Sequence, residues 1–287
     1  GLLAAGGTLG ILIPPSIPLI VYGVIAEESI GKLFLAGVGP GILLITVFAI
    51  YTILVSAFGS QAEASPKSSW SERMAATLRA FPTILLAVVM LGGIYAGAFT
   101  PTEASAIGAT MALLITVVQR SLSWQDFLHA VKDSVKTTSV IFLIVVGAKI
   151  FGKAITLCQL PAQIAQVFET HVPSQLGFII IVSLILLFIG LFLESMSMLL
   201  IMVPVLLPTV LGLGLDPIWF GVYFVLLIEI ALITPPVGLN LFVIQAIAGT
   251  PLSTVVKGVL PFVLMMLGVA VLLALFPQIA LWLPGKL

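Results

Sequence analysis

The chain has 287 residues, of which 61% are hydrophobic and only 8% are charged. This composition excludes an ordinary soluble domain, in which about 25% of the residues are charged. The 11 basic and 11 acidic side chains give a net charge of zero, so nothing indicates a nucleic-acid partner. Cys158 is the single cysteine, which excludes an intrachain disulfide, and His129 and His171 lie in unrelated polar segments without metal-ligand spacing.

Several apolar segments are long enough to cross a lipid bilayer, which takes about 20 residues of helix. They do not alternate between apolar and polar residues, as the strands of a transmembrane barrel would. The sequence therefore predicts an all-α polytopic membrane protein. The chain begins at Gly1, without a methionine and already within an apolar segment. We therefore expect a fragment that lacks an N-terminal part, and not a signal peptide.

Two prolines interrupt the first apolar stretch. Residues 1–13 predict a half-helix that ends at Pro14, because proline removes a backbone donor and clashes with the preceding turn. Residues 17–26 predict a second half-helix. A long span over residues 33–58 follows, in which Gly39-Pro40-Gly41 predicts a kink.

The next part of the chain begins with a polar segment, residues 59–80, whose second half predicts an amphipathic helix on the membrane surface. Residues 81–98 predict a span. Thr102 is the expected N-cap of the following span, residues 104–119, because threonine side chains accept hydrogen bonds from the first free N–H groups of a helix. We expect Thr100–Glu103 to stabilise this helix end and not to form part of a site.

Residues 121–137 alternate polar and apolar residues with helical spacing, which predicts a second helix on the membrane surface, followed by a span over residues 138–157. Lys149 and Lys153 lie one helical turn apart in this span. Two interpretations of Lys149 stay open: it binds a carboxylate of the substrate, or it extends to the membrane interface, as we expect for Lys153.

The last third contains two interrupted elements after an interfacial connection, residues 158–174. Residues 176–193 and 198–211 predict a re-entrant hairpin with Glu194–Ser197 at its tip, although two full spans stay possible. The remaining predicted segments are two half-spans and a final span, at residues 217–233, 239–248 and 258–283.

Lysine and arginine placement gives an orientation, because these residues concentrate in cytoplasmic segments. The segments on the side of residues 59–80 contain Lys67, Arg73, Arg79, Arg120, Lys132, Lys136 and Lys257. The opposite side contains only Lys32 and Lys286, so the C-terminus is predicted to be periplasmic.

The stretch Ile233–Asn240 breaks an apolar run with two prolines and a glycine. Broken backbone at membrane depth is tolerated only where it is buried in protein or lines a watery cavity. The exposed carbonyl groups of such an unwound point suit a cation or a polar ligand. Two simple proline kinks are the alternative.

This broken stretch has a second copy near the N-terminus. Pro14 and Pro235 are 221 positions apart, and the same offset aligns further residues without a gap: Pro15 with Pro236, Ser29 with Thr250, Gly37-Val38 with Gly258-Val259, Pro40 with Pro261 and Leu43 with Leu264. Five predicted spans separate corresponding points, so the two copies cross the membrane in opposite directions. Inverted repeats with paired broken helices are typical of secondary transporters.

Several motifs resemble the large membrane subunit of TRAP transporters, the tripartite ATP-independent periplasmic transporters of bacteria and archaea. They lie in the same order over nearly the whole chain: Gly6–Ser16, Tyr22-Gly23, Ser29-Ile30, Leu33–Gly37, Thr100–Ala104, Glu194–Met198 and Thr234–Leu239. The resemblance also implies a first hairpin before residue 1.

The resemblance implies an elevator-type, sodium-coupled importer of organic acids in the bacterial or archaeal cytoplasmic (inner) membrane. In this family a soluble periplasmic binding protein delivers the substrate, and a small membrane subunit supports the large one. Sialic acid, C4-dicarboxylates, other sugar acids and keto acids all fit the sequence. A related carboxylate transporter without a binding protein stays possible, whereas an enzyme is not expected, since no catalytic pair of side chains is present.

The same resemblance implies a division of the chain into moving and static parts. The moving part is residues 1–30, with the first broken helix, and residues 176–250, with the hairpin and the second broken helix. Residues 31–58, 81–175 and 251–287 form the scaffold, and residues 59–80 form a cytoplasmic linker.

The candidate site lies where the broken helices and the hairpin tip meet. The candidate substrate-binding residues are Ser16, Glu194, Ser195, Met196, Ser197 and Asn240. The candidate Na⁺ ligands are Gly7, Ile13, Pro14, Ser16, Thr234, Pro235, Gly238 and Asn240. Glu194 faces the site or, alternatively, pairs with a basic group or lies at a wet boundary, and Glu229 faces the transport path or hydrogen-bonds to neighbouring helices. Met196 can equally serve packing.

Overall fold

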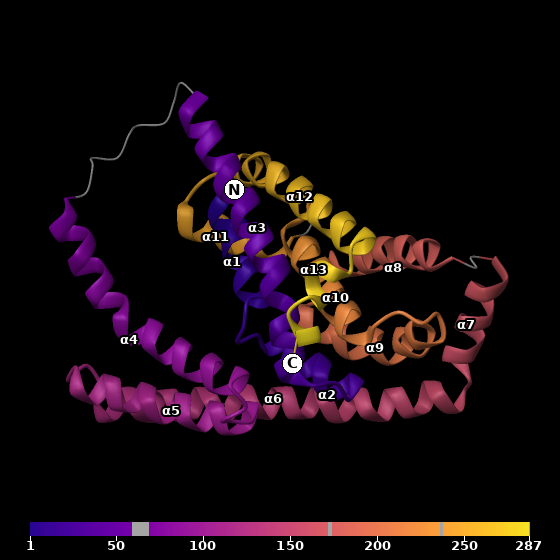
Figure 1. Cartoon of the computed structure of the whole chain (residues 1–287), viewed down its shortest axis with the longest axis horizontal. Coiled ribbons are helices and arrows are strands. Elements are labelled where there is room, and N and C mark those ends of the chain that lie inside the picture. Colours follow the sequence, from indigo (N-terminus) through magenta and orange to yellow (C-terminus); the bar gives the residue numbers. More distant parts are fainter. Residues whose placement is uncertain (59–68, 172–173, 236–237, 287) are drawn as a thin grey trace. The chain divides into compact units, whose positions relative to one another are not determined.

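The computed structural model describes residues 1–58, 69–171, 174–235 and 238–286, and all regular structure within them is helical. The chain forms two compact units, one of residues 1–58 with 144–287 and one of residues 59–143 (Figure 1). Seven helical stretches of the described residues are long and apolar enough to cross a membrane: 2–26, 30–58, 70–95, 101–118, 124–157, 195–212 and 252–275. The predicted all-α polytopic membrane class is therefore confirmed.

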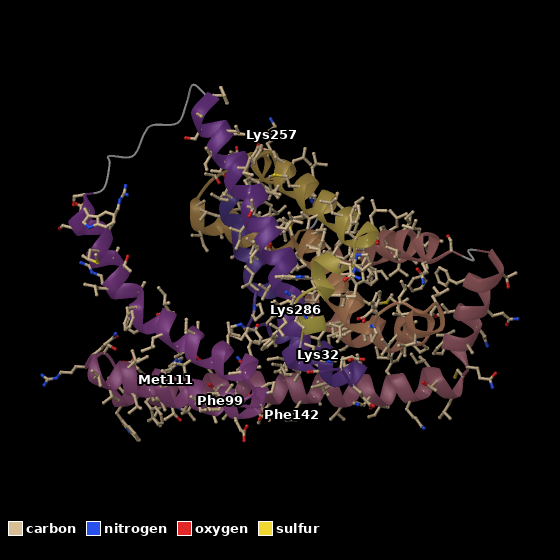
Figure 2. The ribbon with its side chains drawn as sticks, in the orientation of Figure 1. Lys32, Phe99, Met111, Phe142, Lys257 and Lys286 are labelled. Carbon is tan, nitrogen blue, oxygen red and sulfur yellow. The ribbon has the colours of Figure 1, made fainter. Side chains whose placement is uncertain are left out.

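The smaller unit contains α4 (Trp70–Tyr95), α5 (Pro101–Val118) and the first part of α6 (Trp124–Leu157). Helices α4 and α5 pack against each other. Large apolar side chains of this unit lie on the outside, and Phe142 is 66% exposed (Figure 2). An outer surface of this kind suits contact with lipid or with another membrane subunit.

Two predicted boundaries in this region are wrong. The amphipathic surface helix within residues 59–80 and the span over residues 81–98 are one continuous helix, α4, as far as they lie in the described residues. Likewise, the surface helix over residues 121–137 and the span over residues 138–157 are both part of α6, which has 34 residues. The change from polar to apolar composition does not end a helix, because neither proline nor glycine occurs between Trp124 and Val146.

The predicted N-cap at Thr102 is also wrong. Thr100 is the N-cap of α5: its Oγ1 accepts a hydrogen bond from the N–H of Glu103 at 3.3 Å, and the Glu103 carboxylate accepts one from the N–H of Thr100 at 2.8 Å. This reciprocal pair is a capping box. Glu103 therefore stabilises the start of α5, as predicted.

Helix α10 (Pro217–Ile233) is the centre of the larger unit, and all its residues from Trp219 to Ile233 are buried (Figure 1). The helices that pack around α10 are α1 (Leu2–Leu12), α2 (Ile17–Ala26), α3 (Ile30–Phe58), α8 (Gln175–Gly190), α9 (Ser195–Gly212), α11 (Leu239–Ala248), α12 (Leu252–Leu275) and α13 (Gln278–Leu281). A helix that is enclosed on every side is expected to be apolar all round, and from Trp219 to Ile233, Glu229 is the one charged exception in α10.

The order α1–α2–α3 repeats as α10–α11–α12. Helices α1 and α10 end at Leu12 and Ile233, which are 221 positions apart, and α2 and α11 have 10 residues each. The predicted broken helices are therefore present at the predicted places. The final span begins at Leu252 and not at residue 258, and it ends at Leu275, shortly before Pro277.

The connection over residues 158–174 contains a further helix, α7 (Leu160–His171), which packs on α9. Helices α8 and α9 form the predicted hairpin, joined by residues 191–194. Helix α9 has 18 residues and is long enough to cross a membrane by length and composition. The re-entrant course of this hairpin stays a prediction.

Candidate functional site

The first break lies between α1 and α2. Ile13 leaves the helical conformation, with φ −79° and ψ 128°, and the Pro14–Pro15 peptide bond is cis. Ser16 is buried, its hydroxyl donates a hydrogen bond to the carbonyl oxygen of Ile11, and its Oγ accepts one from the N–H of Leu19 at 3.4 Å. Ser16 therefore joins the end of α1 to the start of α2.

The second break has nearly the same backbone geometry at its start. Thr234 has φ −88° and ψ 128°, and its hydroxyl donates to the carbonyl oxygen of Ile230 at 2.5 Å. Pro236 and Val237 lie outside the described residues. Gly238 has a φ of +40°, a conformation that residues with a Cβ rarely adopt, and it is the N-cap of α11.

Both breaks place the C-terminal end of a half-helix inside the larger unit. The last carbonyl groups of a helix lack partners within that helix, and they carry the negative end of its dipole. Helices α1 and α10 pack against each other, and α11 packs against both. The structure therefore brings together two helix ends that can contribute oxygen ligands to a cation.

The other Na⁺ candidates lie around these ends. Asn240 is half-buried in the first turn of α11, whereas Gly7 lies on an exposed face of α1. Pro14 is buried, and Pro235 is half-buried. No hydrogen bond within the described residues joins the Asn240 side chain to either break.

The end of α8, which leads into the hairpin tip, lies against the helix that leads into the second break. A Cβ atom on Gly190, at the end of α8, would lie 2.5 Å from the Cβ of Ala231 on α10. Ala231 is three residues before Thr234, whose N–H donates to the Ala231 carbonyl oxygen at 3.2 Å. Helix α9 also packs closely on α2, the helix that follows the first break.

The tip residues themselves have different environments. Glu194 is exposed and is the N-cap of α9, because its carboxylate accepts a hydrogen bond from the N–H of Ser197 at 3.3 Å. Ser195 is buried, and Met196 and Ser197 are half-buried. Among the described residues, Glu194 forms no ion pair, which leaves its carboxylate free to serve both the helix end and a ligand.

Glu229 is fully buried, five residues before Thr234. Its carboxylate lies against the backbone of Leu12, the last residue of α1, without a hydrogen bond of good geometry among the described residues. Glu229 occupies the position in the second repeat that Thr8 occupies in the first, 221 residues earlier. Thr8 is also buried, and its hydroxyl donates to the carbonyl oxygen of Ala5 at 2.8 Å.

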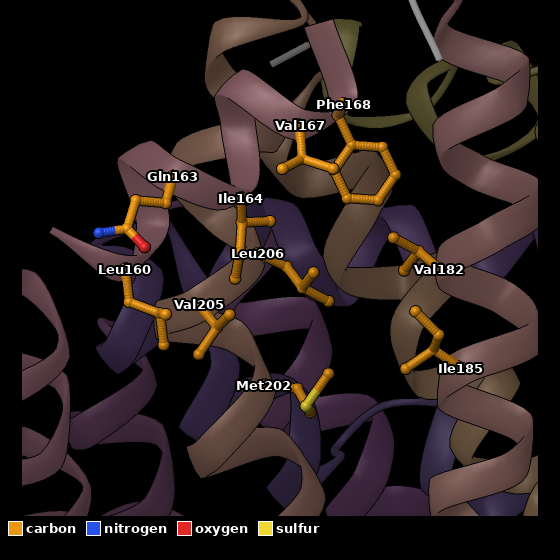
Figure 3. Close-up of a pocket in the computed structure, with 10 residues that line it drawn as sticks. All are labelled: Leu160, Gln163, Ile164, Val167, Phe168, Val182, Ile185, Met202, Val205 and Leu206. Carbon is orange, nitrogen blue, oxygen red and sulfur yellow. The ribbon is translucent and has the colours of Figure 1, made fainter. Parts of the chain in front are cut away.

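Two cavities of the larger unit lie away from the breaks. One, of about 410 Å³, is an open cavity lined by α7, α8 and α9, and Gln163 is the polar side chain among its apolar lining (Figure 3). An apolar cavity of this kind offers little to a carboxylate. The second cavity, of about 440 Å³, contains Lys149, Lys153 and Glu27. From the sequence, Glu27 could not be associated with the two lysines, because Glu27 lies more than a hundred residues before them in the chain.

His129 lies on α6 in the smaller unit, where its Nδ1 pairs with Asp133 at 3.1 Å on an exposed face. It is therefore a surface residue, as predicted. Cys158 is exposed. Within the described residues, no group of three or more His, Cys, Asp or Glu side chains is placed to hold a metal ion.

Comparison with known proteins gives the family. Residues 1–279 match the family described as the tripartite ATP-independent periplasmic transporter, DctM component. Similar proteins include the sialic acid TRAP transporter large permease of Vibrio cholerae, 39% identical over 99% of this chain and 66% of the relative. The C4-dicarboxylate TRAP transporter large permease of Pseudomonas aeruginosa is 38% identical over 100% of this chain and 67% of the relative.

A third relative is the ectoine/5-hydroxyectoine TRAP transporter large permease of Ruegeria pomeroyi, 37% identical over 98% of this chain and 66% of the relative. The chain thus spans about two thirds of the length of these relatives. The family consists of transporter components and not of enzymes. With its apolar spans and its match over residues 1–279, the chain is a multi-pass inner-membrane protein that belongs to the DctM component family of TRAP transporters.

Proposed function

We propose that the chain is the transporting core of a sodium-coupled permease that imports organic acids. The single observation that carries this proposal is the duplicated break. Two half-helices end 221 positions apart, with the same extended backbone at Ile13 and Thr234. Paired broken helices of this kind are the usual place for substrate and coupling-ion sites in secondary transporters.

Sodium is the coupling ion that suits these ends. Na⁺ is a hard cation that prefers several oxygen ligands, and the terminal carbonyl groups of two half-helices supply them. The proposed ligands come from residues at or near the two breaks: Gly7, Ile13, Pro14, Ser16, Thr234, Pro235, Gly238 and Asn240. The hydroxyl groups of Ser16 and Thr234 already donate to helix carbonyls, and Ser16 also accepts a hydrogen bond from Leu19. Each hydroxyl oxygen therefore keeps at least one lone pair with which it can bind a cation.

The substrate is proposed to bind between the breaks and the hairpin tip, where Glu194, Ser195, Met196 and Ser197 lie. The relatives are named for sialic acid, C4-dicarboxylates and ectoine, so small carboxylate-bearing solutes are the expected class. A periplasmic binding protein delivers the solute, and a small membrane subunit completes the transporter.

An elevator movement is the proposed mechanism. Residues 1–30 and 176–250 carry both breaks and the hairpin, and they shift against a scaffold of residues 31–58, 81–175 and 251–287. The bias of lysine and arginine supports a periplasmic C-terminus. The close packing of α1, α10 and α11 supports the movement of both breaks as one body.

Uptake by liposomes tests the proposal. The full-length large subunit, reconstituted with its small subunit and supplied with the binding protein, should take up a labelled organic acid only when an inward Na⁺ gradient is present. Uptake that is unchanged without Na⁺ would exclude the coupling. Uptake at the same rate without the binding protein would favour the alternative, an ion-coupled carboxylate transporter that works alone.

A further inference from the structure

The cavity of about 440 Å³ in the larger unit has walls from three helices that are distant in the sequence. Ile25 and Glu27 come from the end of α2, and Pro204 comes from α9. The remaining lining residues belong to α6: Val145, Ala148, Lys149, Gly152, Lys153 and Thr156. Its volume lies within the range of small-molecule sites, about 300–1,000 Å³.

The two lysines in the C-terminal half of α6 both line this cavity. Lys149 and Lys153 are four residues apart and therefore neighbours on the helix surface. Gly152, between them in the sequence, faces α9: a Cβ added to it would lie in ordinary van der Waals contact with the Cβ of Pro204, at 3.5 Å. Both lysines are exposed, so their ammonium groups lie at the open side of the cavity.

Neither lysine has a partner of its own. Within the described residues, no ion pair or hydrogen bond is formed by the ammonium group of Lys149 or Lys153, including any with Glu27. Glu27 is exposed and sits in a left-handed backbone conformation, with φ 58°, just after α2. The cavity therefore combines two free positive groups with one free negative group.

The hydrogen-bonding groups are also divided by type. The two ammonium groups only donate, whereas the Glu27 carboxylate only accepts. The Thr156 hydroxyl donates to the carbonyl oxygen of Gly152 at 2.7 Å, so towards the cavity it accepts as well. A ligand that matches this set carries a carboxylate for the lysines and hydroxyl donors for Glu27 and Thr156.

We propose that this cavity binds a hydroxylated monocarboxylate, such as a sugar acid, with its carboxylate between Lys149 and Lys153 and its hydroxyl groups towards Glu27 and Thr156. This inference rests on the proposed function, because it names the class of organic acid that the permease takes. It adds a second binding place for that acid, apart from the site proposed at the breaks and the hairpin tip. A dicarboxylate is disfavoured, since its second carboxylate cannot donate a hydrogen bond and is repelled by Glu27.

Direct binding tests the cavity separately from transport. Gluconate, glucuronate and sialic acid serve as hydroxylated monocarboxylates, and succinate serves as the dicarboxylate, each titrated calorimetrically into the full-length complex in lipid nanodiscs with Na⁺. At least one monocarboxylate should bind the unmodified complex more tightly than succinate. The double variant Lys149→Gln with Lys153→Gln should bind it at least 10-fold more weakly, and Lys149→Arg with Lys153→Arg should retain binding.

The variant Glu27→Gln should raise the affinity for succinate relative to the monocarboxylates. Lys257→Gln is the matched control, because Lys257 lies on α12 and does not line the cavity (Figure 2). Its affinities should be unchanged, and nanodiscs of neutral lipid should give the same results as anionic ones. Tighter binding of succinate to the unmodified complex, or unchanged binding by the double glutamine variant, would overturn the proposal.

The proposal would also be overturned if the double glutamine variant lost affinity only in nanodiscs of anionic lipid. The two lysines would then bind a lipid phosphate and not the carboxylate of the solute. Failure of the proposed function is distinguishable from all these results. It would appear as uptake without a Na⁺ requirement in liposomes, while the calorimetric preference for hydroxylated monocarboxylates persisted.

Discussion

Gly190 and Ala231 join the hairpin to the second broken helix: a Cβ on Gly190 would lie only 2.5 Å from the Cβ of Ala231. The sulfur of Met198 would lie 3.1 Å from the same added atom. The close approach fixes the end of α8 against α10, three residues before Thr234. Movement of the hairpin tip is therefore tied to the backbone that leaves α10.

The variant Gly190→Val should disrupt this contact. Inserting side-chain atoms into a packed contact typically costs about 1–3 kcal/mol, and here the nearest atom belongs to a short side chain on a buried helix. Thermal unfolding of the purified complex should show a lower Tm, and Na⁺-driven uptake should fall. Gly212→Ala is the control, since no atom of its surroundings lies within 4 Å of the added Cβ. Equal Tm values for the two variants would contradict the contact.

Tyr22 links the two repeats, because its hydroxyl donates to the carbonyl oxygen of Pro217 at 2.6 Å. Tyr22→Phe removes this bond and leaves a half-buried carbonyl without that donor. The expected loss of stability is about 1 kcal/mol. Chemical denaturation measures it, and Tyr51→Phe is the control, since the described structure gives Tyr51 a ring contact with Phe262 but no hydroxyl bond. A smaller loss for Tyr22→Phe than for Tyr51→Phe would contradict the role of the bond.

The two threonines at the start of α5 should differ in their effect on stability. Thr100→Ala removes the N-cap of the capping box and should cost about 0.5–2 kcal/mol. Thr102→Ala, inside the first turn, should be nearly neutral. Hydrogen exchange at the N–H of Glu103, which bonds to the Thr100 hydroxyl, should accelerate only in Thr100→Ala. If hydrogen exchange became faster only in Thr102→Ala, Thr102 would be the N-cap after all, as predicted from the sequence.

Gly238→Ala should impair the second break. A residue with a Cβ pays about 1–2 kcal/mol in the left-handed region, and the added Cβ would also lie 2.8 Å from the Leu241 side chain. We expect a raised Na⁺ concentration for half-maximal uptake, together with reduced stability. Gly268→Ala, on α12 with no atom within 4 Å of its added Cβ, should leave both unchanged. If the Na⁺ concentration for half-maximal uptake were unchanged in Gly238→Ala, the second break would not take part in ion binding.

The breaks could be predicted from the sequence because proline acts locally. Pro14 and Pro235 remove backbone donors wherever they stand, so the ends of α1 and α10 follow directly from the sequence. The capping box of α5 was also accessible, since Thr100 and Glu103 have the required spacing. It was missed because Thr102 lies closer to the apolar run.

Other features depend on contacts between distant segments. The approach of Gly190 to Ala231 arises from the packing of α8 on α10. Glu27 and Lys149 come to line one cavity because the end of α2 and α6 both border it. No local pattern encodes either pair. The division of α6 into a surface helix and a span failed for another reason: a change in polarity alters what surrounds a helix but not its hydrogen bonds.

The unbroken course of α6 has a consequence for its position in the bilayer. With 34 residues and a rise of about 1.5 Å per residue, the helix is about 51 Å long. The hydrocarbon core is about 30 Å thick, so a helix along the membrane normal extends some 20 Å into headgroups or water. A rod of this length projects the polar turns around Lys132 and Lys136 beyond the lipid chains, or else it lies strongly tilted.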